Sequence, residues 1–237
     1  MVKIMNKAIE KMKGKICISC QAYEDTPLYG AENMKTMAAS VMLGGATCLR
    51  ACWPQDIKAI RSLSDDIIIV GIYKRIEEGK TEGKYPIITP NFEDAKSVIE
   101  AGADVLALDC TIFPERGEEE LLALLKQIKT AYPDIAIMAD IGRFSDAKFA
   151  AESGYVDIIS STLSDYYTKS GVVDVDFIKE LKTLGLPVNG EGKIWDLNDL
   201  QKTLEAEPWC VTIGSSITRP HLITKRFLDF GKKFDYE

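Results

Sequence analysis

The sequence has a single histidine, His221, among 237 residues, and this scarcity excludes several kinds of site. A Ser–His–Asp triad of the usual kind needs a histidine beside its nucleophile, but His221 lies just inside the last predicted helix, where surface positions are common. The sequence also lacks a Gly-x-x-x-x-Gly-Lys-Ser/Thr loop, and no Gly-x-Gly-x-x-Gly run opens a first strand-to-helix unit. It therefore disfavours nucleotide and dinucleotide binding.

Long apolar runs and clustered basic residues are missing as well. No stretch approaches the roughly 18 apolar residues of a membrane span, and the N-terminal segment lacks the apolar core of a secretory signal. The net charge of −7 argues against a nucleic-acid partner, which would need clustered Lys and Arg. We expect a cytoplasmic protein that binds a small molecule, with no membrane or nucleic-acid partner.

Six cysteines are present, and two pairs have spacings that resemble metal motifs: Cys17 with Cys20, and Cys48 with Cys52. Residues 17 and 20 point to opposite faces of a predicted strand, because side chains alternate along a strand. Reduced thiols are the default state when no signal sequence is seen. We therefore predict buried structural thiols and no metal site.

A short apolar run followed by a longer amphipathic segment recurs eight times along the chain. Near-continuous apolar runs are typical of strands in a parallel sheet that is covered by helices. The predicted strands are Ile16–Cys20, Ala46–Arg50, Ile67–Tyr73, Val105–Asp109, Ile135–Ala139, Val156–Ser160, Pro187–Gly190 and Cys210–Gly214. The predicted helices between and after them are Glu32–Leu43, Pro54–Leu63, Glu93–Glu100, Glu118–Thr130, Ser145–Ser153, Asp176–Leu184, Asp196–Ala206 and Thr218–Phe230.

Eight strand–helix repeats favour closure into a (β/α)8 barrel over an open sheet. We predict one α/β domain over residues 1–237, a TIM barrel whose bottom is closed by an N-terminal helix. That helix carries Ile4, Ala8 and Met12 at helical spacing. The irregular segment Lys74–Asn91 is the longest connection, which makes it a candidate lid.

Catalytic groups of such barrels lie at the carboxyl ends of the strands. Polar or ionisable residues close seven of the eight predicted strands: Gln21, Arg50, Lys74 with Arg75, Asp109, Asp140, Glu191 and Ser215. Lys74 shares a strand face with Val70 and Ile72, as Asp109 does with Val105 and Ala107 and Asp140 with Ala136 and Met138. A charged residue often ends a strand simply because the following loop is solvated, and this explains most of these positions singly. A lysine–arginine pair directly after an apolar strand is a stronger signal of catalysis.

Two glycine-containing turns predict a phosphate site. Gly190-Glu191-Gly192 follows the seventh predicted strand, and Gly214-Ser215 followed by Arg219 comes after the eighth. Glycine lets backbone N–H groups approach an anion closely, and barrels often bind phosphate with these two loops. An ordinary strand-to-helix turn is the alternative. We predict that Gly192, Gly214, Ser215 and Arg219 hold a phosphate.

The chain resembles the N-acetylmannosamine-6-phosphate 2-epimerases in segments that run almost from end to end. These segments are Ile18–Ala22, Pro27–Tyr29, Gly44–Ala46, Arg50–Ala51, Val70–Arg75, Ile88–Pro90, Ala101–Asp104, Leu106–Asp109, Met138–Ile141, Ser161–Ser164, Gly190–Gly192, Gly214–Pro220 and Ile223–Phe227. The resemblance implies a homodimeric barrel isomerase that interconverts N-acetylmannosamine 6-phosphate and N-acetylglucosamine 6-phosphate in sialic acid and amino-sugar breakdown. The reaction requires no metal or organic cofactor.

The resemblance also implies roles for individual residues. Lys74 is the implied base at C2, and Glu191 the residue that helps to open the sugar ring and handles protons. The implied substrate-binding residues are Gln21, Arg50 and Asp140, with Arg219 and the backbone near Gly192, Gly214 and Ser215 at the phosphate. A lysine base must be neutral near pH 7, so its pKa has to fall from about 10.4 through burial and nearby positive charge. Arg75 and Arg50 are the candidate sources of that charge.

Several points stay open at the level of sequence. The chain departs from the family pattern at Asn189, Lys193, Cys110–Arg116 and Asp165, which touch the rim of the pocket and its phosphate side. A Schiff-base lyase or aldolase that uses Lys74 is one alternative, and a non-catalytic phosphosugar-binding barrel is another. Proton transfer by one base on both faces, or by Lys74 and Glu191 on opposite faces, fits the sequence equally.

Overall fold

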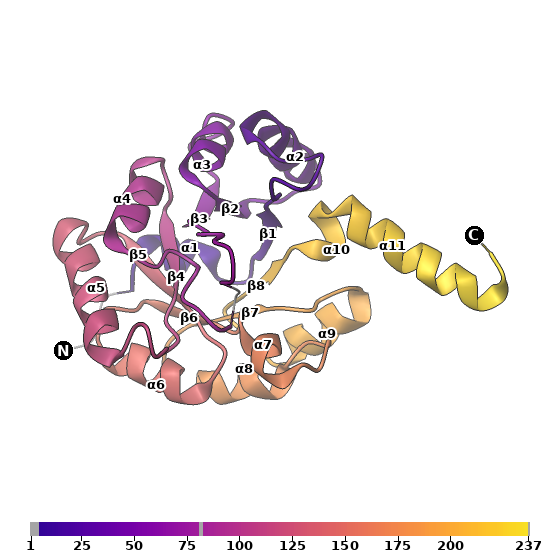
Figure 1. Cartoon of the computed structure of the whole chain (residues 1–237). Helices are drawn as coiled ribbons and strands as arrows, with labels where there is room; N and C mark the ends of the chain where they lie inside the picture. Colours follow the sequence, from indigo (N-terminus) through magenta and orange to yellow (C-terminus); the bar gives the residue numbers. More distant parts are fainter. Residues whose placement is uncertain (1–4, 81–82, 237) are drawn as a thin grey trace.

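Eight parallel strands form a closed barrel in the computed structural model, which describes residues 5–80 and 83–236 (Figure 1). The strands are β1 (Ile16–Cys20), β2 (Cys48–Cys52), β3 (Ile68–Ile72), β4 (Val105–Asp109), β5 (Ala136–Asp140), β6 (Ile158–Ser160), β7 (Val188–Glu191) and β8 (Cys210–Ile213). Each strand pairs with its neighbours in the chain, and β8 pairs with β1 to close the ring. The predicted (β/α)8 barrel is confirmed.

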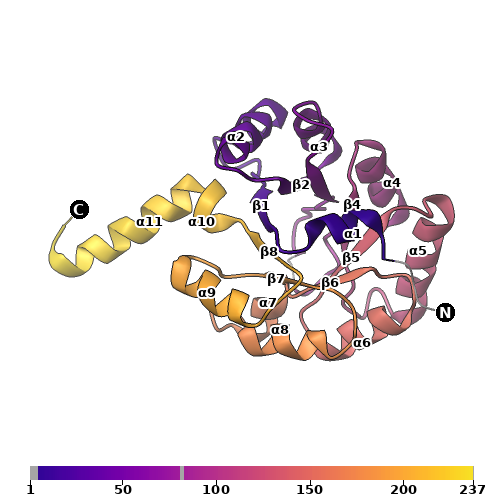
Figure 2. The ribbon, with the colours of Figure 1, turned by 180° about the vertical axis from the view of Figure 1, so that it is seen from behind.

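Helices surround this barrel on the outside (Figures 1 and 2). They are α1 (Lys7–Met12), α2 (Ala31–Leu43), α3 (Pro54–Arg61), α4 (Phe92–Glu100), α5 (Glu118–Ala131), α6 (Phe144–Glu152), α7 (Ser164–Thr168), α8 (Val175–Lys182), α9 (Leu197–Glu205), α10 (Ser215–Thr218) and α11 (Pro220–Gly231), with the 3-10 turn η1 (Lys232–Phe234). Ile4 of the predicted first helix and positions 81 and 82 of the candidate lid lie outside the described residues. Within those residues, no helix is long and apolar enough to span a membrane.

Most elements lie within two residues of their predicted bounds, and three differences affect the description of the site. β2 runs two residues further than expected, so Arg50 lies inside the strand and does not end it. The predicted last helix is two helices, α10 and α11, which meet at Arg219 because the following Pro220 disfavours helical backbone before it. The short helix α7 was not predicted at all.

Side chains of the strands alternate between two apolar layers. The layer inside the barrel contains Cys17, Val70 and Ile72, whereas the layer between strands and helices contains Cys20 and Leu106. The predicted opposite orientation of Cys17 and Cys20 is therefore confirmed. All six cysteines are buried and free.

Helix α1 crosses the bottom of the barrel, at the amino ends of the strands (Figure 2). Ile9 and Met12 are fully buried and belong to the inner apolar layer. Asn6 caps the helix by accepting from the Ala8 N–H at 2.8 Å, and its side-chain amide donates to the Asp134 carbonyl at 2.8 Å. The predicted closure of the barrel by an N-terminal helix is confirmed.

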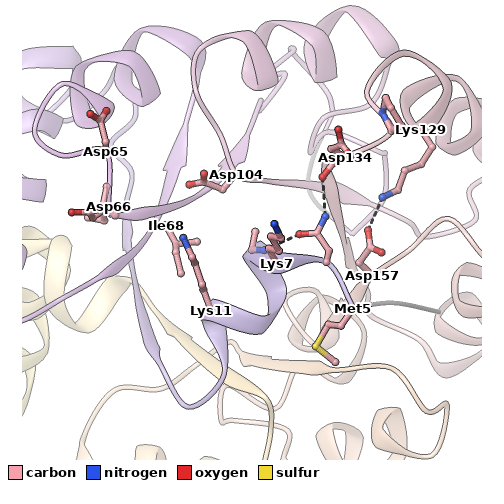
Figure 3. A pocket seen from close by; sticks show the side chains of 14 residues that line it. Met5, Lys7, Lys11, Asp65, Asp66, Ile68, Asp104, Lys129, Asp134 and Asp157 are labelled. Carbon is pink, nitrogen blue, oxygen red and sulfur yellow. Dashed lines mark hydrogen bonds and ion pairs between the residues drawn. The ribbon is translucent and has the colours of Figure 1, made fainter. Parts of the chain in front are cut away.

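A cavity of about 750 Å3 lies beside α1 at this bottom face (Figure 3). Three of its charged lining residues are in ion pairs: Lys129 contacts Asp157 at 2.7 Å, and Asp104 contacts Arg61. In barrels, groups at this face serve stability, whereas catalysis belongs to the opposite face. Catalytic groups are therefore expected at the carboxyl ends of the strands.

Candidate active site

A cavity of about 370 Å3 opens at the carboxyl ends of the strands. Its lining joins residues from β1, β3, β7 and β8 that are far apart in the sequence. Seven of the predicted site residues line it: Gln21, Lys74, Glu191, Gly192, Gly214, Ser215 and Arg219. The strand ends therefore bring the predicted acid–base pair and the predicted phosphate loops into one space.

The backbone around Lys74 is held from three sides. Residue 74 forms an antiparallel bridge with Ile88, and the Trp53 indole N–H donates to the Lys74 carbonyl at 3.0 Å. Thr89, in the left-handed region with φ of 47°, accepts from the Tyr73 N–H at 3.0 Å through its hydroxyl. The Lys74 amine lies 2.7 Å from the Tyr23 hydroxyl. This framework fixes where the lysine leaves the barrel rim.

Glu191 is held by donors that converge on one of its two carboxylate oxygens. Its Oε2 accepts from Arg50 Nη1 at 3.0 Å and from the Asn189 amide at 3.1 Å. The Thr162 and Ser160 hydroxyls lie 3.2 and 3.4 Å from the same oxygen. Burial raises the pKa of Glu191 above its ordinary value, with Arg50 opposing the shift and Asp140 adding to it. A carboxyl group with a raised pKa is suited to exchange a proton with a substrate.

Arg50 and Asp140 form a buried ion pair that holds Glu191 in place. Arg50 is 1% exposed and Asp140 is 0% exposed, and the guanidinium contacts both oxygens of Asp140, at 3.0 and 2.6 Å. The Thr162 hydroxyl donates to Asp140 at 2.7 Å. Because Arg50 also donates to Glu191, one guanidinium joins the two carboxylates. Neither Arg50 nor Asp140 lines the cavity, so the two lie behind Glu191, which does.

The turns after β7 and β8, where a phosphate site is predicted, form one end of the cavity. Gly192 has φ of 112°, a conformation that other residues rarely adopt. The Ser161 hydroxyl donates to the Glu191 carbonyl at 2.9 Å and accepts from its N–H at 3.0 Å, which fixes the first turn. The Arg219 guanidinium lies 4.9 Å from the centre of the Tyr23 ring. One cation and the backbone of two turns therefore face the same space.

Gln21 and Arg75 lie at different depths of the site. Gln21 is buried and donates to the Ser19 hydroxyl at 2.8 Å. Arg75 lines a neighbouring cavity of about 780 Å3 that shares Tyr23 and Lys74 as its wall. Its guanidinium makes a bidentate contact with Asp94, at 2.6 and 2.8 Å. The charge of Arg75 is thus balanced outside the main cavity, which the sequence did not indicate.

Sequence reasoning missed several side chains that contact the predicted residues, among them Tyr23, Ser160, Thr162 and Asn189. Ser160 ends β6, the one strand without a predicted polar closing residue, and strand parity could have identified it. Tyr23 lies in an irregular loop, where no periodicity predicts the direction of a side chain.

The fold and this cavity define a (β/α)8-barrel protein with Lys74 and Glu191 beside two glycine-containing turns. The family described as "Putative N-acetylmannosamine-6-phosphate epimerase" matches residues 34–233. Two curated relatives are both named "Putative N-acetylmannosamine-6-phosphate 2-epimerase". The one from Caldanaerobacter subterraneus subsp. tengcongensis is 38% identical, over 96% of this chain and 95% of its own length. The one from Listeria monocytogenes serotype 4b is 36% identical, over 96% and 99%.

A solved structure is similar across the whole barrel. It is the N-acetylmannosamine-6-phosphate 2-epimerase from Clostridium perfringens, with a TM-score of 0.83, 32% identity, and coverage of 94% of this chain and 95% of that one. An aldolase, QR15, has a TM-score of 0.63 at 15% identity, which shows the fold alone. The chain belongs to the family of N-acetylmannosamine-6-phosphate epimerases.

Proposed function

We propose that this protein interconverts N-acetylmannosamine 6-phosphate and N-acetylglucosamine 6-phosphate, as an isomerase of sialic acid and amino-sugar breakdown. One observation carries the proposal. Lys74, Glu191 and the two glycine-containing turns with Arg219 line a single cavity in a chain that belongs to the epimerase family. The cavity thus combines a base, a carboxyl group of raised pKa and an anion site.

The reaction follows from the acidity of C2 in the open-chain sugar, where C2 lies next to the aldehyde. In this proposal Glu191 assists ring opening by moving the proton of the anomeric hydroxyl. The Lys74 amine then takes the proton from C2, and the C–H electron pair passes to the aldehyde oxygen as an enolate. Return of a proton to the opposite face of C2 inverts the centre and returns the electron pair to carbon. No redox partner is consumed.

The other predicted residues receive binding and positioning roles in this scheme. Arg50 and Asp140 are proposed to hold Glu191 in position, because the Arg50 guanidinium contacts both carboxylates. Gln21 lies at the cavity wall and is proposed to bind the sugar. Arg75, whose side chain is 43% exposed, is proposed to bind substrate from the neighbouring cavity. Arg219, with the backbone at Gly192, Gly214 and Ser215, is proposed to hold the phosphate.

The test is to incubate the purified protein with N-acetylmannosamine 6-phosphate and to follow both epimers by proton NMR. We expect N-acetylglucosamine 6-phosphate to form until a constant ratio is reached from either side. Borohydride added during turnover is the second arm. It should leave the protein unmodified, because proton transfer forms no covalent intermediate. An adduct on Lys74 would support a Schiff-base lyase and overturn the proposed reaction, whereas tight binding without turnover would support a binding protein.

We also propose that the chain acts as one barrel domain over residues 1–237 and as a homodimer. Helix α11 supports the dimer: it projects away from the barrel (Figures 1 and 2), and none of its twelve residues is buried. Phe227 is 76% exposed and Phe230 is 60% exposed. Such a large unburied apolar surface is uncommon on a monomer and marks an interaction site.

A groove on the barrel complements this helix. It has a volume of about 800 Å3 and lies where an eighth outer helix would cover β8 and β1. Its apolar lining comes from β1, α2, α9, β8 and α10: Ile16, Ile18, Val41, Leu197, Leu200, Ile213 and Ile217. In the proposed dimer, α11 of each copy covers the groove of the other, which gives a closed twofold arrangement. Sedimentation velocity at micromolar concentration tests this, and a monomer would contradict it.

The proposed location is the cytoplasm. The support is chemical: all six cysteines are free, and reduced thiols are characteristic of that compartment. Fractionation of cells that express the tagged chain would test the location, and recovery outside the cytoplasmic fraction would contradict it.

A further inference from the structure

Tyr23 lies between the proposed base and the proposed phosphate arginine. Its hydroxyl is 2.7 Å from the Lys74 amine, and the same amine lies 5.3 Å from the centre of its ring. The Arg219 guanidinium lies 4.9 Å from that ring centre. Tyr23 also lines both the main cavity and the neighbouring one. A single aromatic side chain therefore contacts the cations at both ends of the site.

The ring of Tyr23 is itself fixed by Trp53. The two rings meet edge to face, with centroids 6.1 Å apart and planes at 82°. Trp53 also donates its indole N–H to the Lys74 carbonyl. The backbone of Lys74 and the ring that contacts its amine are thus anchored to the same residue. This shared anchor presets the distance between the Tyr23 hydroxyl and the Lys74 amine.

We propose that Tyr23 is a positioning residue for Lys74, one that holds the amine at C2 and sets its distance from Arg219. The inference rests on the proposed role of Lys74 as the base. A lysine amine stands on a flexible four-carbon stem, so an unguided amine samples many positions. Once it has taken the C2 proton, the amine is an ammonium ion. The phenol oxygen then accepts a charge-assisted hydrogen bond from this ammonium.

The hydroxyl and the ring of Tyr23 have separable tasks in this proposal. The hydroxyl acts on Lys74 alone, so its loss should slow proton abstraction and leave phosphate binding intact. The ring also supports Arg219, so its loss should weaken the binding of the phosphosugar as well. Tyr23→Phe removes the first task, and Tyr23→Leu removes both.

The chain offers a matched control in Tyr29. This residue also packs edge to face on Trp53, with centroids 5.8 Å apart, but its hydroxyl donates to Glu24 at 3.3 Å and not to the base. Tyr29→Phe therefore makes the same chemical change on the same tryptophan. It should leave kcat and KM at their wild-type values.

The experiment is steady-state kinetics of the three variants with both epimers, together with the isotope effect of C2-deuterated substrate. Tyr23→Phe should lower kcat about 10- to 100-fold, the range for a lost hydrogen bond to a charged group, with KM little changed. Its isotope effect should exceed that of the wild type, because proton abstraction becomes more rate-limiting. Tyr23→Leu should lower kcat at least as much and raise KM in addition.

Two results would overturn the inference while the proposed function stands. One is a Tyr23→Phe variant with wild-type kcat and isotope effect. The other is an equal loss in Tyr29→Phe, which would assign the effect to packing around Trp53. A wild-type protein without epimerase activity would instead contradict the proposed function, and the role of Tyr23 with it.

Discussion

At the scale of single residues, the inner ends of β4 and β5 carry two aspartates with different surroundings. Asp140 accepts hydrogen bonds from Arg50 and Thr162. Asp109 accepts from the Thr111 N–H at 2.8 Å through Oδ1, whereas its buried Oδ2 has no partner among the described residues. Burial raises the pKa of Asp109 to about 7, and Arg116 opposes the shift. The same residue type at adjacent strand ends therefore has different hydrogen-bond partners.

The raised pKa of Asp109 predicts how stability depends on pH. A carboxyl group whose pKa is raised by folding stabilises the fold fully below its unfolded pKa of about 4. This contribution falls as the pH rises and is lost at about pH 7. In Asp109→Asn the titration is absent, so the variant should gain free energy of unfolding relative to the wild type between about pH 4 and 7, then keep a constant difference. Urea denaturation across this range measures it, and a flat difference throughout would contradict the assignment.

Some single residues could be placed from the sequence and others could not. Strand parity grouped Lys74, Asp109 and Asp140 with apolar residues that lie inside the barrel. Arg50 was given to a strand end because interiors of strands are apolar, yet it lies within β2, where Asp140 pairs with it across the barrel. That partner is 90 residues away, and no local pattern reveals such a pair. The position of the Tyr23 side chain depends on its contact with Trp53, and no local sequence pattern predicts that contact either.

At the scale of elements, α1 is a short helix with a large effect on packing. Two of its six residues, Ile9 and Met12, are fully buried at the bottom of the barrel. The Trp209 indole N–H donates to the Ile9 carbonyl at 2.7 Å, which ties α1 to the residue before β8. The helix therefore closes the core far from the proposed active site.

This position predicts a loss of stability without a loss of catalysis. Met12→Ala should lower the free energy of unfolding by about 2–5 kcal/mol, because a buried methionine is replaced by a cavity. The kcat and KM at a temperature where the variant remains folded should be those of the wild type. Met5→Ala is the control, since Met5 is 41% exposed and should change stability by less than about 0.5 kcal/mol. Equal effects of the two substitutions would contradict the role of α1.

Helix ends were predicted less well than helix positions. Periodicity located all eight outer helices, but the last one is interrupted at Arg219, although Pro220 was visible in the sequence. The predicted helix began at Thr218, two residues before the proline, whereas in the structure Thr218 is the last residue of α10. α7 was missed because five residues are too few to establish a period.

At the scale of the whole molecule, closure of the barrel follows from the number of repeats, but the direction of α11 does not. A sequence pattern states that the last helix has an apolar face. It does not state whether this face covers its own barrel or that of a second copy. In the structure α11 points away from the barrel. The groove on the barrel lies where an outer helix would pack, and its lining is apolar, as is one face of α11.

The proposed exchange of α11 predicts the effect of a charge on this helix. Phe227→Glu should raise the dissociation constant of the dimer by more than about 30-fold, since a buried aromatic anchor contributes about 2 kcal/mol or more. Leu122→Glu is the control, because Leu122 is 39% exposed on α5, away from α11. Sedimentation velocity over a concentration series measures both. A Phe227→Glu variant that associates as the wild type does would contradict the exchange.

Proton transfer at C2 by Lys74 is the central step of the proposed reaction. Proton NMR in D2O tests it, by following the C2 signal of N-acetylmannosamine 6-phosphate in the presence of wild-type protein or Lys74→Met. We expect loss of the C2 proton signal with the wild type, as deuterium enters both epimers, and no exchange with a Lys74→Met protein that still binds the phosphosugar. Retention of the C2 proton with the wild type, or wild-type exchange with Lys74→Met, would contradict it.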